Sequence, residues 1–342
     1  MTGPGLDWTF GSAWPYRPRW FTTPDGRMHY IVEGPRDGRP VVLVHGNPTW
    51  GFVYRNFVGP LTNAGHRVIV PDHLGFGRSE KPRVASLCTV SRHIARFDAL
   101  LESLDLHGAT VVPQDWGGPI GLSWAVAHPE RVERLFILNT FAHRPPWKVP
   151  IPLPLRLFRA PGTGELLVKG LNMFVRGFLF RAGVTHPERL TAPVHRAYLA
   201  PHPSWASRTA MLAFPRQIPS GPTGPVSELA ARLEGDLRRH FTDRPVAIAW
   251  GMKDPAFTPH WLELWLQTFP TQTSCASPTS GITSKKTPTS ASSPRCCTSS
   301  AGRHASDVIL NQPAALPGHH NRATAAPTAP SLRRQGGLRR PT

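Results

Sequence analysis

Apolar and polar positions alternate in short blocks along the first 142 residues. Apolar runs typical of buried strands occur at 28–33, 41–44, 68–70, 111–112 and 134–138, and another follows at 246–249. Between them, the stretch 90–106 places Ile94, Phe97, Leu101 and Leu104 on one face of a helix. This alternation of strands and helices predicts an α/β fold with a mostly parallel sheet.

The pattern changes after residue 142. From 143 to 222 prolines are frequent, and helical pieces rich in Leu and Phe occur at 166–180 and 208–214. The strand-and-helix pattern returns at 223 and continues to 270. We therefore expect residues 1–142 and 223–270 to form one core, with residues 143–222 inserted as a helical cap.

The remaining segment, residues 271–342, differs from everything before it. It contains no Phe, Tyr or Trp, and Ser, Thr, Pro and Ala dominate it. A segment with so little apolar surface gains too little from burial to offset the entropy lost on folding. We expect a disordered, low-complexity tail.

The net charge of +18 would ordinarily suggest a nucleic-acid partner. However, residues 271–342 hold nine Lys or Arg and a single acid, Asp307, and the remaining excess is scattered over helices and loops without a basic stripe. A nucleic-acid footprint clusters on one face or element. We therefore expect no nucleic-acid partner.

Targeting signals and cysteine usage indicate the compartment. Residues 1–11 have neither a basic nor an apolar leader region, and the longest candidate span, 171–180, is too short and is divided by Arg176. Cys88 is the only cysteine in the first 270 residues, which suggests a reducing compartment. We expect a cytoplasmic protein with no membrane partner.

The most informative chemistry lies in residues 111–118, VVPQDWGG. A β-branched run ends in a sharp turn with Asp115 at its tip, and an apolar helical stretch follows at 120–126. This is the layout of a nucleophile elbow, in which a strained strand-to-helix turn presents one side chain to the pocket. A carboxylate there can attack carbon and form an ester intermediate. An ordinary turn-forming aspartate is the competing interpretation.

Three further strands end in polar, glycine-bearing loops: HGNPTW at 45–50, PDHLGFGRS at 71–79 and WGMKD at 250–254. Because the carboxyl ends of parallel strands meet at one edge of a sheet, we expect these loops to converge on the elbow. Together the four motifs, in this order, resemble the α/β-hydrolase family. Within it they look most like the haloalkane dehalogenases, over roughly residues 1–270.

The resemblance implies roles for four residues. Asp115 would be the nucleophile, and the side chains of Asn47 and Trp116 would bind the departing halide. The backbone N–H groups of Asn47 and Trp116 would form the oxyanion hole, and Asp254 would orient a histidine base. No cofactor and no metal is implied, and the partners are a small apolar halogenated substrate and water. The competing interpretations are that Trp116 is a packing residue, Asn47 a loop residue and Asp254 a cap.

The catalytic histidine of the family is missing from this pattern. If Thr271–Pro288 is reverse-translated and the frame is moved by two bases, synonymous codons permit PDVLRLPDVGHYFQEDA, which resembles the family's histidine segment. The histidine codon would straddle Gly281 and Ile282. The sequence therefore predicts a frameshifted tail, and a chain that lacks both the catalytic base and the last core strand and helix.

Three functions fit these observations. The first is a haloalkane dehalogenase that forms an aspartyl ester and releases alcohol and halide. The second is an epoxide hydrolase, which also uses an aspartate elbow but needs tyrosine hydroxyls from the cap, where only Tyr198 occurs. The third is an inactive, truncated α/β-hydrolase-like protein, which the missing histidine favours.

Overall fold

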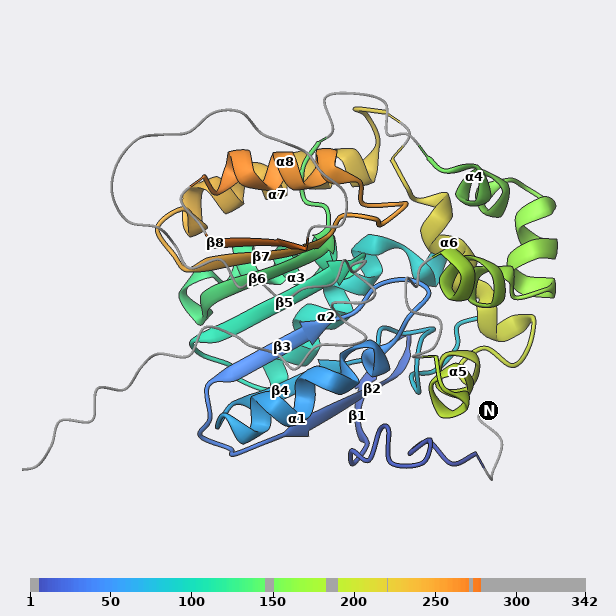
Figure 1. Ribbon diagram of the computed structural model, residues 1–342, viewed down its shortest axis with the longest axis horizontal. Helices are drawn as coiled ribbons and strands as arrows, with labels where there is room; N and C mark the ends of the chain where they lie inside the picture. The colour runs from blue at the N-terminus through green and yellow to red at the C-terminus, as the bar shows by residue number, and fades with distance from the viewer. Residues whose placement is uncertain (1–5, 145–150, 183–189, 220, 271–272, 278–342) are drawn as a thin grey trace, which may run out of the picture.

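One twisted sheet with helices on both faces forms the body of the molecule (Figure 1). The computed structural model describes residues 6–144, 151–182, 190–219, 221–270 and 273–277. Its strands are β1 (Arg19–Thr23), β2 (Gly26–Glu33), β3 (Pro40–Val44), β4 (Arg67–Pro71), β5 (Ala109–Asp115), β6 (Val132–Thr140), β7 (Val246–Gly251) and β8 (Thr273–Ser277). Their order across the sheet is β1-β2-β4-β3-β5-β6-β7-β8.

The sheet is mostly parallel, as the sequence predicts. β1 and β2 run antiparallel to their neighbours, and every pairing from β4 to β8 is parallel. The six predicted strands are present as β2 to β7. β3 is buried at all five positions, as expected for a central strand shielded on both faces. The sequence analysis missed β1, whose residues RWFTT are mostly exposed at the sheet edge.

The expectation that the last core strand is missing is wrong. β8 pairs in parallel with β7, from Ala247 opposite Thr273 to Gly251 opposite Ser277. Main-chain groups form the ladder between strands, so a segment can join an open sheet edge without an apolar side-chain pattern. The other residues of 271–342, and with them the predicted disorder of the tail, lie outside the described residues.

The helices of the core are α1 (Arg55–Asn63), α2 (Val90–Ser103), α3 (Gly117–Ala127), α7 (Pro225–Phe241) and α8 (Pro259–Thr268). Helix α3 packs between α2 and α7, and these three cover one face of the sheet, while α1 lies on the other (Figure 1). Short 3-10 turns occur at η1 (Gly51–Tyr54), η2 (Ala85–Cys88) and η3 (Pro129–Arg131).

Between β6 and α7 the described chain is entirely helical or irregular. Its elements are α4 (Leu153–Arg159), η4 (Glu165–Gly170), η5 (Phe174–Ala182), α5 (Ala192–Leu199), η7 (Ala206–Arg208) and α6 (Thr209–Arg216). They gather at one end of the sheet, beyond the carboxyl ends of the parallel strands (Figure 1). The piece predicted at 166–180 is two π-helices, η4 and η5, interrupted near Asn172, whose φ is +53°.

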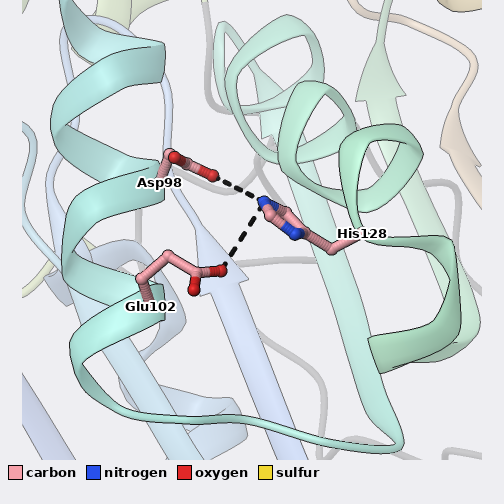
Figure 2. A group of neighbouring side chains, drawn as sticks. All are labelled: Asp98, Glu102 and His128. Atoms are coloured by element: carbon pink, nitrogen blue, oxygen red, sulfur yellow. Dashed lines mark hydrogen bonds and ion pairs between the residues drawn. The ribbon is translucent and has the colours of Figure 1, made fainter.

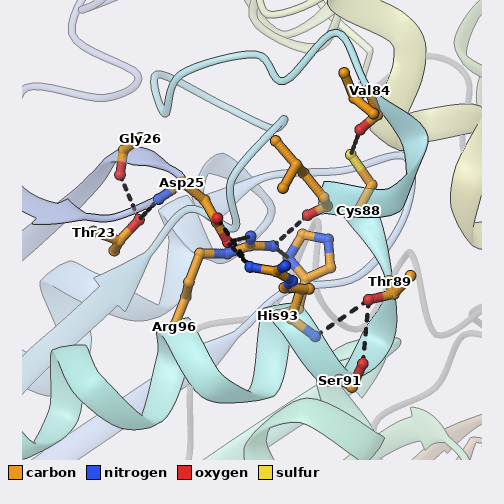
Figure 3. Close-up of polar contacts among 11 residues, drawn as sticks. Thr23, Asp25, Gly26, Val84, Cys88, Thr89, Ser91, His93 and Arg96 are labelled. Carbon is orange, nitrogen blue, oxygen red and sulfur yellow. Dashed lines mark hydrogen bonds and ion pairs between the residues drawn. The ribbon is translucent and has the colours of Figure 1, made fainter.

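A buried ion pair fixes the turn between β1 and β2 to the core (Figure 3). Arg96 on α2 places Nη1 2.7 Å from Asp25 Oδ2, and its Nη2 donates to the carbonyl of Leu87 at 2.9 Å. Cys88 lies beside this pair, and burial raises the pKa of its thiol to about 11. The thiol is therefore protonated and unreactive at neutral pH.

Candidate active site

Asp115 lies at the junction of β5 and α3, where the sequence predicts a nucleophile elbow. Its φ is +53°, a left-handed conformation that Asp adopts more readily than most residues. A Cβ on Gly117 would stand 2.1 Å from the carbonyl oxygen of Val44, so α3 can begin this close to β3 only with glycine there. The elbow therefore turns the Asp115 side chain out of the sheet and into a cavity.

The loop after β3 supplies a hydrogen bond to the carboxylate. The backbone N–H of Asn47 donates to Asp115 Oδ1 at 2.7 Å. A Cβ at Gly46 would stand 2.2 Å from the same oxygen, so the loop reaches the carboxylate because Gly46 has no side chain. The resemblance assigned this donor to the oxyanion hole, and in the structure it is bound to the Asp115 carboxylate.

His45 supports this loop and does not border either cavity. Its Nδ1 donates to the carbonyl of Gly46 at 2.9 Å, and its Nε2 accepts from the backbone N–H of His73 at 3.0 Å. His73 Nε2 in turn donates to the carbonyl of His45 at 2.9 Å. Burial lowers the pKa of both imidazoles, so the pair is neutral and acts as a fixed bridge behind Asn47.

The two side chains predicted to bind halide both border the cavity beside Asp115. The Asn47 amide donates one hydrogen to the carbonyl of Met211 on α6 at 3.3 Å, which leaves its second hydrogen available. Trp116 is buried, with its ring against Phe141 and Phe214. Its indole N–H has no hydrogen-bond partner among the described residues, so it can donate to a leaving group.

The electrostatic setting of Asp115 is unusual for a carboxylate. Burial of the group raises its pKa to about 7, the two backbone N–H groups of Trp116 and Asn47 act in the opposite direction, and the charge of Asp254 adds to the increase. At neutral pH the Asp115 carboxyl is therefore partly protonated. A loss of solvation also makes the ionised form more reactive toward carbon, since water no longer competes for its lone pairs.

Asp254 follows β7 and shares the cavity with Asp115. Its Oδ1 accepts from the backbone N–H groups of Ala256 at 2.8 Å and Phe257 at 3.0 Å, which closes a turn of its own loop. Its Oδ2 accepts from the amide of Asn139 at 3.2 Å. Asp254 therefore does not cap α8, whose N-cap is Thr258, but holds its own loop while bordering the same cavity as Asp115.

Asn139 is a residue whose role the sequence analysis missed. It occupies the end of β6, and its amide joins the ends of β6 and β7. Asn139 Oδ1 accepts from the N–H of Gly251 at 2.7 Å, and Nδ2 donates to the carbonyl of Gly251 at 3.0 Å. Its position after a buried strand was the only available signal.

Two adjoining cavities meet at Asp115. The first, about 600 Å3 including its open mouth, is bordered by Gln114, Tyr198 and Asp254. The second, about 700 Å3 on the same basis, has a mainly apolar lining from the cap and from α8. No histidine borders either cavity in the part of the chain that the structure describes. His304, His319 and His320 of the tail lie outside the described residues.

A possible metal-ligand set lies away from this site. Asp98 and Glu102 on α2 face His128 at the end of α3 (Figure 2), with His128 Nε2 2.8 Å from Asp98 Oδ1 and 3.6 Å from Glu102 Oε1. Arg131 also pairs with Glu102 at 3.1 Å. These side chains satisfy one another as an ion-pair cluster, and none of them borders the cavities at Asp115.

The comparison with known proteins can be set beside this geometry. Residues 39–281 match the family model described as alpha/beta hydrolase fold. The chain belongs to this family. Among curated relatives, it is 38% identical over 258 residues to a cis-3-alkyl-4-alkyloxetan-2-one decarboxylase of Shewanella oneidensis, covering 75% of this chain and 79% of the relative. It is 37% identical over 248 residues to haloalkane dehalogenase 1 of Mycobacterium bovis, covering 71% and 79%.

Solved structures give the same assignment. The haloalkane dehalogenase DatA from Agrobacterium tumefaciens superposes with a TM-score of 0.67 at 26% identity, covering 76% of this chain and 88% of that one. The haloalkane dehalogenase DpaA from Paraglaciecola agarilytica gives 0.64 at 26% identity, covering 77% and 86%. The chain is therefore an α/β-hydrolase enzyme similar to the haloalkane dehalogenases.

Proposed function

We propose that Asp115 displaces a leaving group from a saturated carbon, and that the leaving group is the halide of a small haloalkane. The observation that carries this proposal is the cavity in which the Asp115 carboxylate, the Asn47 amide and the free indole N–H of Trp116 lie together. An attack in line with the carbon–halogen bond leaves the halide in a nearly dry site, where only such donors can stabilise its charge.

The reaction begins with ionised Asp115. Its oxygen forms a bond to carbon as the carbon–halogen bond breaks, and the halide accepts hydrogen bonds from Trp116 and Asn47. The product is an alkyl ester on Asp115. Release of the alcohol requires water activated by a base, and Asp254 alone offers only its carboxylate. Since the family's histidine is missing from this chain, we expect the ester to form and then to persist.

A second substrate class is favoured by the decarboxylase relatives. Two of them, from Shewanella oneidensis and Xanthomonas campestris, are 38% and 37% identical and are covered over 79% and 86% of their length. A four-membered lactone also offers a saturated carbon with a leaving group. Attack by Asp115 at the ring C4 breaks the C4–O bond and frees a carboxylate, whose loss as CO2 can form the C3–C4 double bond and expel Asp115.

This second reaction consumes no water, because the atoms of the lactone divide into an alkene and CO2. The last step of the lactone reaction, in which CO2 is lost and Asp115 is released, therefore does not need a base that activates water. The same nucleophile, cavity and donor pair serve both proposals, and the difference lies in how Asp115 is released. The epoxide hydrolase alternative also needs water, and Tyr198, which borders the first cavity, is the cap hydroxyl available to it.

One experiment separates these functions. The purified chain is incubated with a 1-bromoalkane, with a cis-3-alkyl-4-alkyloxetan-2-one, or with an alkyl epoxide. Intact-mass spectrometry follows the Asp115 adduct, and chromatography follows bromide, alkene and diol. Dehalogenation predicts one equivalent of bromide and a stable adduct, whereas the lactone reaction predicts repeated release of alkene.

The control is Asp115→Asn, which should abolish all adducts. Asp37→Asn, a substitution on an exposed loop, should change nothing. A chain that folds but forms no adduct and no product with any of the three substrates would exclude the proposed nucleophile.

A further inference from the structure

The outer surface of the cap exposes apolar side chains. Among the described residues, eight large apolar side chains are exposed, and five of them lie on cap elements: Leu153, Leu157, Leu166, Leu171 and Trp205. Their exposed fractions run from 43% to 63%. Scattered single exposures are ordinary on any protein, but this concentration on one small region is not.

These side chains belong to neighbouring elements. Leu153 and Leu157 stand four residues apart on α4, and therefore on one side of that helix. Helix α4 packs against η4, and η4 packs against η7. A Cβ added to Gly170 would lie 3.6 Å from the Trp205 ring and 3.7 Å from Leu166 Cδ1, so these two side chains are adjacent. We call this set of five residues the outer cap face.

The positive charge of the folded chain is concentrated in the cap. Residues 143–222 contain eleven Lys or Arg and two Glu, whereas 1–142 and 223–270 together contain nineteen Lys or Arg and eighteen Asp or Glu. The expectation that the excess charge is scattered was therefore wrong: outside the tail, nearly all of it belongs to the cap. Arg156 and Arg176 are exposed and form no ion pair with any described residue.

Aromatic and cationic groups also meet on this face. Lys169 Nζ lies 5.2 Å from the centre of the Trp205 ring. Arg156 stands between Leu153 and Leu157 in the sequence of α4. Leu and Trp interleaved with Lys and Arg form the combination by which peripheral proteins enter the headgroup region of a membrane.

The inner side of the same elements borders the reaction cavity. Leu155 of α4 and Phe174 and Phe178 of η5 line the apolar cavity that contains Asp115. Thus α4 has one apolar side over the nucleophile and another exposed to solvent. An apolar substrate dissolved in a lipid layer against the outer cap face would lie one helix thickness from the site.

We propose that the outer cap face docks the protein on an anionic lipid surface. Its Leu and Trp side chains enter the acyl boundary, and the cap Arg and Lys side chains contact lipid phosphates. Nucleic acid would use the charges but would leave the exposed leucines unexplained. No described helix is long and apolar enough to cross a bilayer, so the contact is with the membrane surface. The proposal goes beyond the reaction above and replaces the expectation of no membrane partner.

The test is flotation of the full chain with phosphatidylcholine vesicles and with vesicles that also contain phosphatidylglycerol. We expect binding to the anionic vesicles, weakened by added salt. Leu166→Ser combined with Trp205→Ala should reduce partitioning about tenfold, given the apolar area removed. Arg156→Gln and Arg176→Gln should each reduce it about fivefold.

Matched controls separate the cap from the rest of the chain. Trp20→Ala removes an exposed Trp of β1 and should leave binding unchanged. The tail is also basic, so Arg333, Arg334, Arg339 and Arg340 are replaced by Ser in one variant. Circular dichroism confirms that each variant is folded. Binding that is lost with the tail substitutions, or that survives all the cap substitutions, would overturn the proposal, as would a duplex DNA affinity equal to that for anionic vesicles.

Discussion

At the scale of the residue, the reaction that we propose depends on the surroundings of one carboxylate. Asp115 is held in a left-handed conformation, faces Asp254 across a cavity and is bound by the N–H of Asn47. Burial and the neighbouring charge raise its pKa to about 7. The group therefore changes between its protonated and its ionised form within the physiological pH range.

The first prediction follows from this pKa. The rate of ester formation with a bromoalkane should rise about tenfold per pH unit below about pH 7 and level off above it, because only the ionised carboxylate attacks. Asp254→Asn removes the charge that contributes to the increase and should shift the midpoint to lower pH. Intact-mass time courses at several pH values measure both. A rate independent of pH between about 5 and 9 would contradict the assignment.

The second prediction is that ionised Asp115 lowers the free energy of unfolding. The pKa of Asp115 is about 7 in the folded chain, whereas the ordinary pKa of an aspartate side chain is 3.8. The folded state binds the proton more tightly, so the contribution to stability falls as pH rises through this window. Asp115→Asn should therefore be more stable than the parent chain by about 1–4 kcal/mol at about pH 8, with little gain near pH 4.

Urea unfolding of both chains at the two pH values measures this difference. Asp37→Asn serves as the control, because it removes a carboxylate from an exposed loop. An Asp115→Asn variant that is less stable than the parent at the higher pH would show that the ionised carboxylate stabilises the fold.

The sequence could predict which residues meet at this cavity, but not their hydrogen-bonding partners or their pKa values. The strand-to-helix turn motif singled out Asp115 and Trp116 as candidate site residues. The loops at the ends of two other strands singled out Asn47 and Asp254. The role of Asn139 could not be predicted, because its two hydrogen-bonding partners are 112 and 115 residues away. Nor could the pKa of Asp115, since it depends on how completely the cap excludes water.

At the scale of the element, the pattern of apolar residues located the buried strands. It did not predict the edge strands, whose pairing depends on main-chain hydrogen bonds. β2 to β7 each carry runs that only a buried strand explains. β1 and β8 lie at the two edges of the sheet, where main-chain hydrogen bonds suffice and the side-chain pattern is weak. Pairing with β8 gives β7 a neighbour on both sides, so this edge of the sheet lies at β8.

The third prediction tests how the ends of β6 and β7 are joined. Asn139→Leu keeps the size of the side chain but leaves the N–H and carbonyl of Gly251 without their buried partner. The loss of these bonds should lower the free energy of unfolding by about 2–3 kcal/mol. Asn63→Leu, at the exposed end of α1, is the matched control. Urea midpoints that fall equally for the two variants would show that the Asn139 bridge contributes no special stability.

At the scale of the whole molecule, the core and the cap differ in net charge and in the part of the site that each supplies. The core, nearly neutral, places Asp115 and Asp254 at the strand ends, and the basic cap covers them with an apolar lining. The first cavity is bordered by both carboxylates and, among the described residues, by no histidine. For the reaction that we propose, this is where a histidine base would have to lie.

The fourth prediction concerns that base. A reading frame moved by two bases from codon 271 would place a histidine where the codons of Gly281 and Ile282 meet, and sequencing of codons 268–290 tests whether the shift is real. We expect the chain as written to release about one equivalent of bromide and then stop, because nothing activates water against the ester. The frame-restored chain should turn over repeatedly, since its histidine can activate water while Asp254 orients the imidazole.

Two variants of the frame-restored chain test this prediction. Asp115→Asn in the frame-restored chain should abolish both the first equivalent and the later turnovers. Replacement of the restored histidine by glutamine should return the enzyme to a single equivalent with a persistent adduct, as expected when only the second step loses its catalytic group. Sustained bromide release by the unaltered chain would mean that a residue of the present sequence already serves as the base. Asp254 would then be the group to test, because it is the carboxylate that shares the first cavity with Asp115.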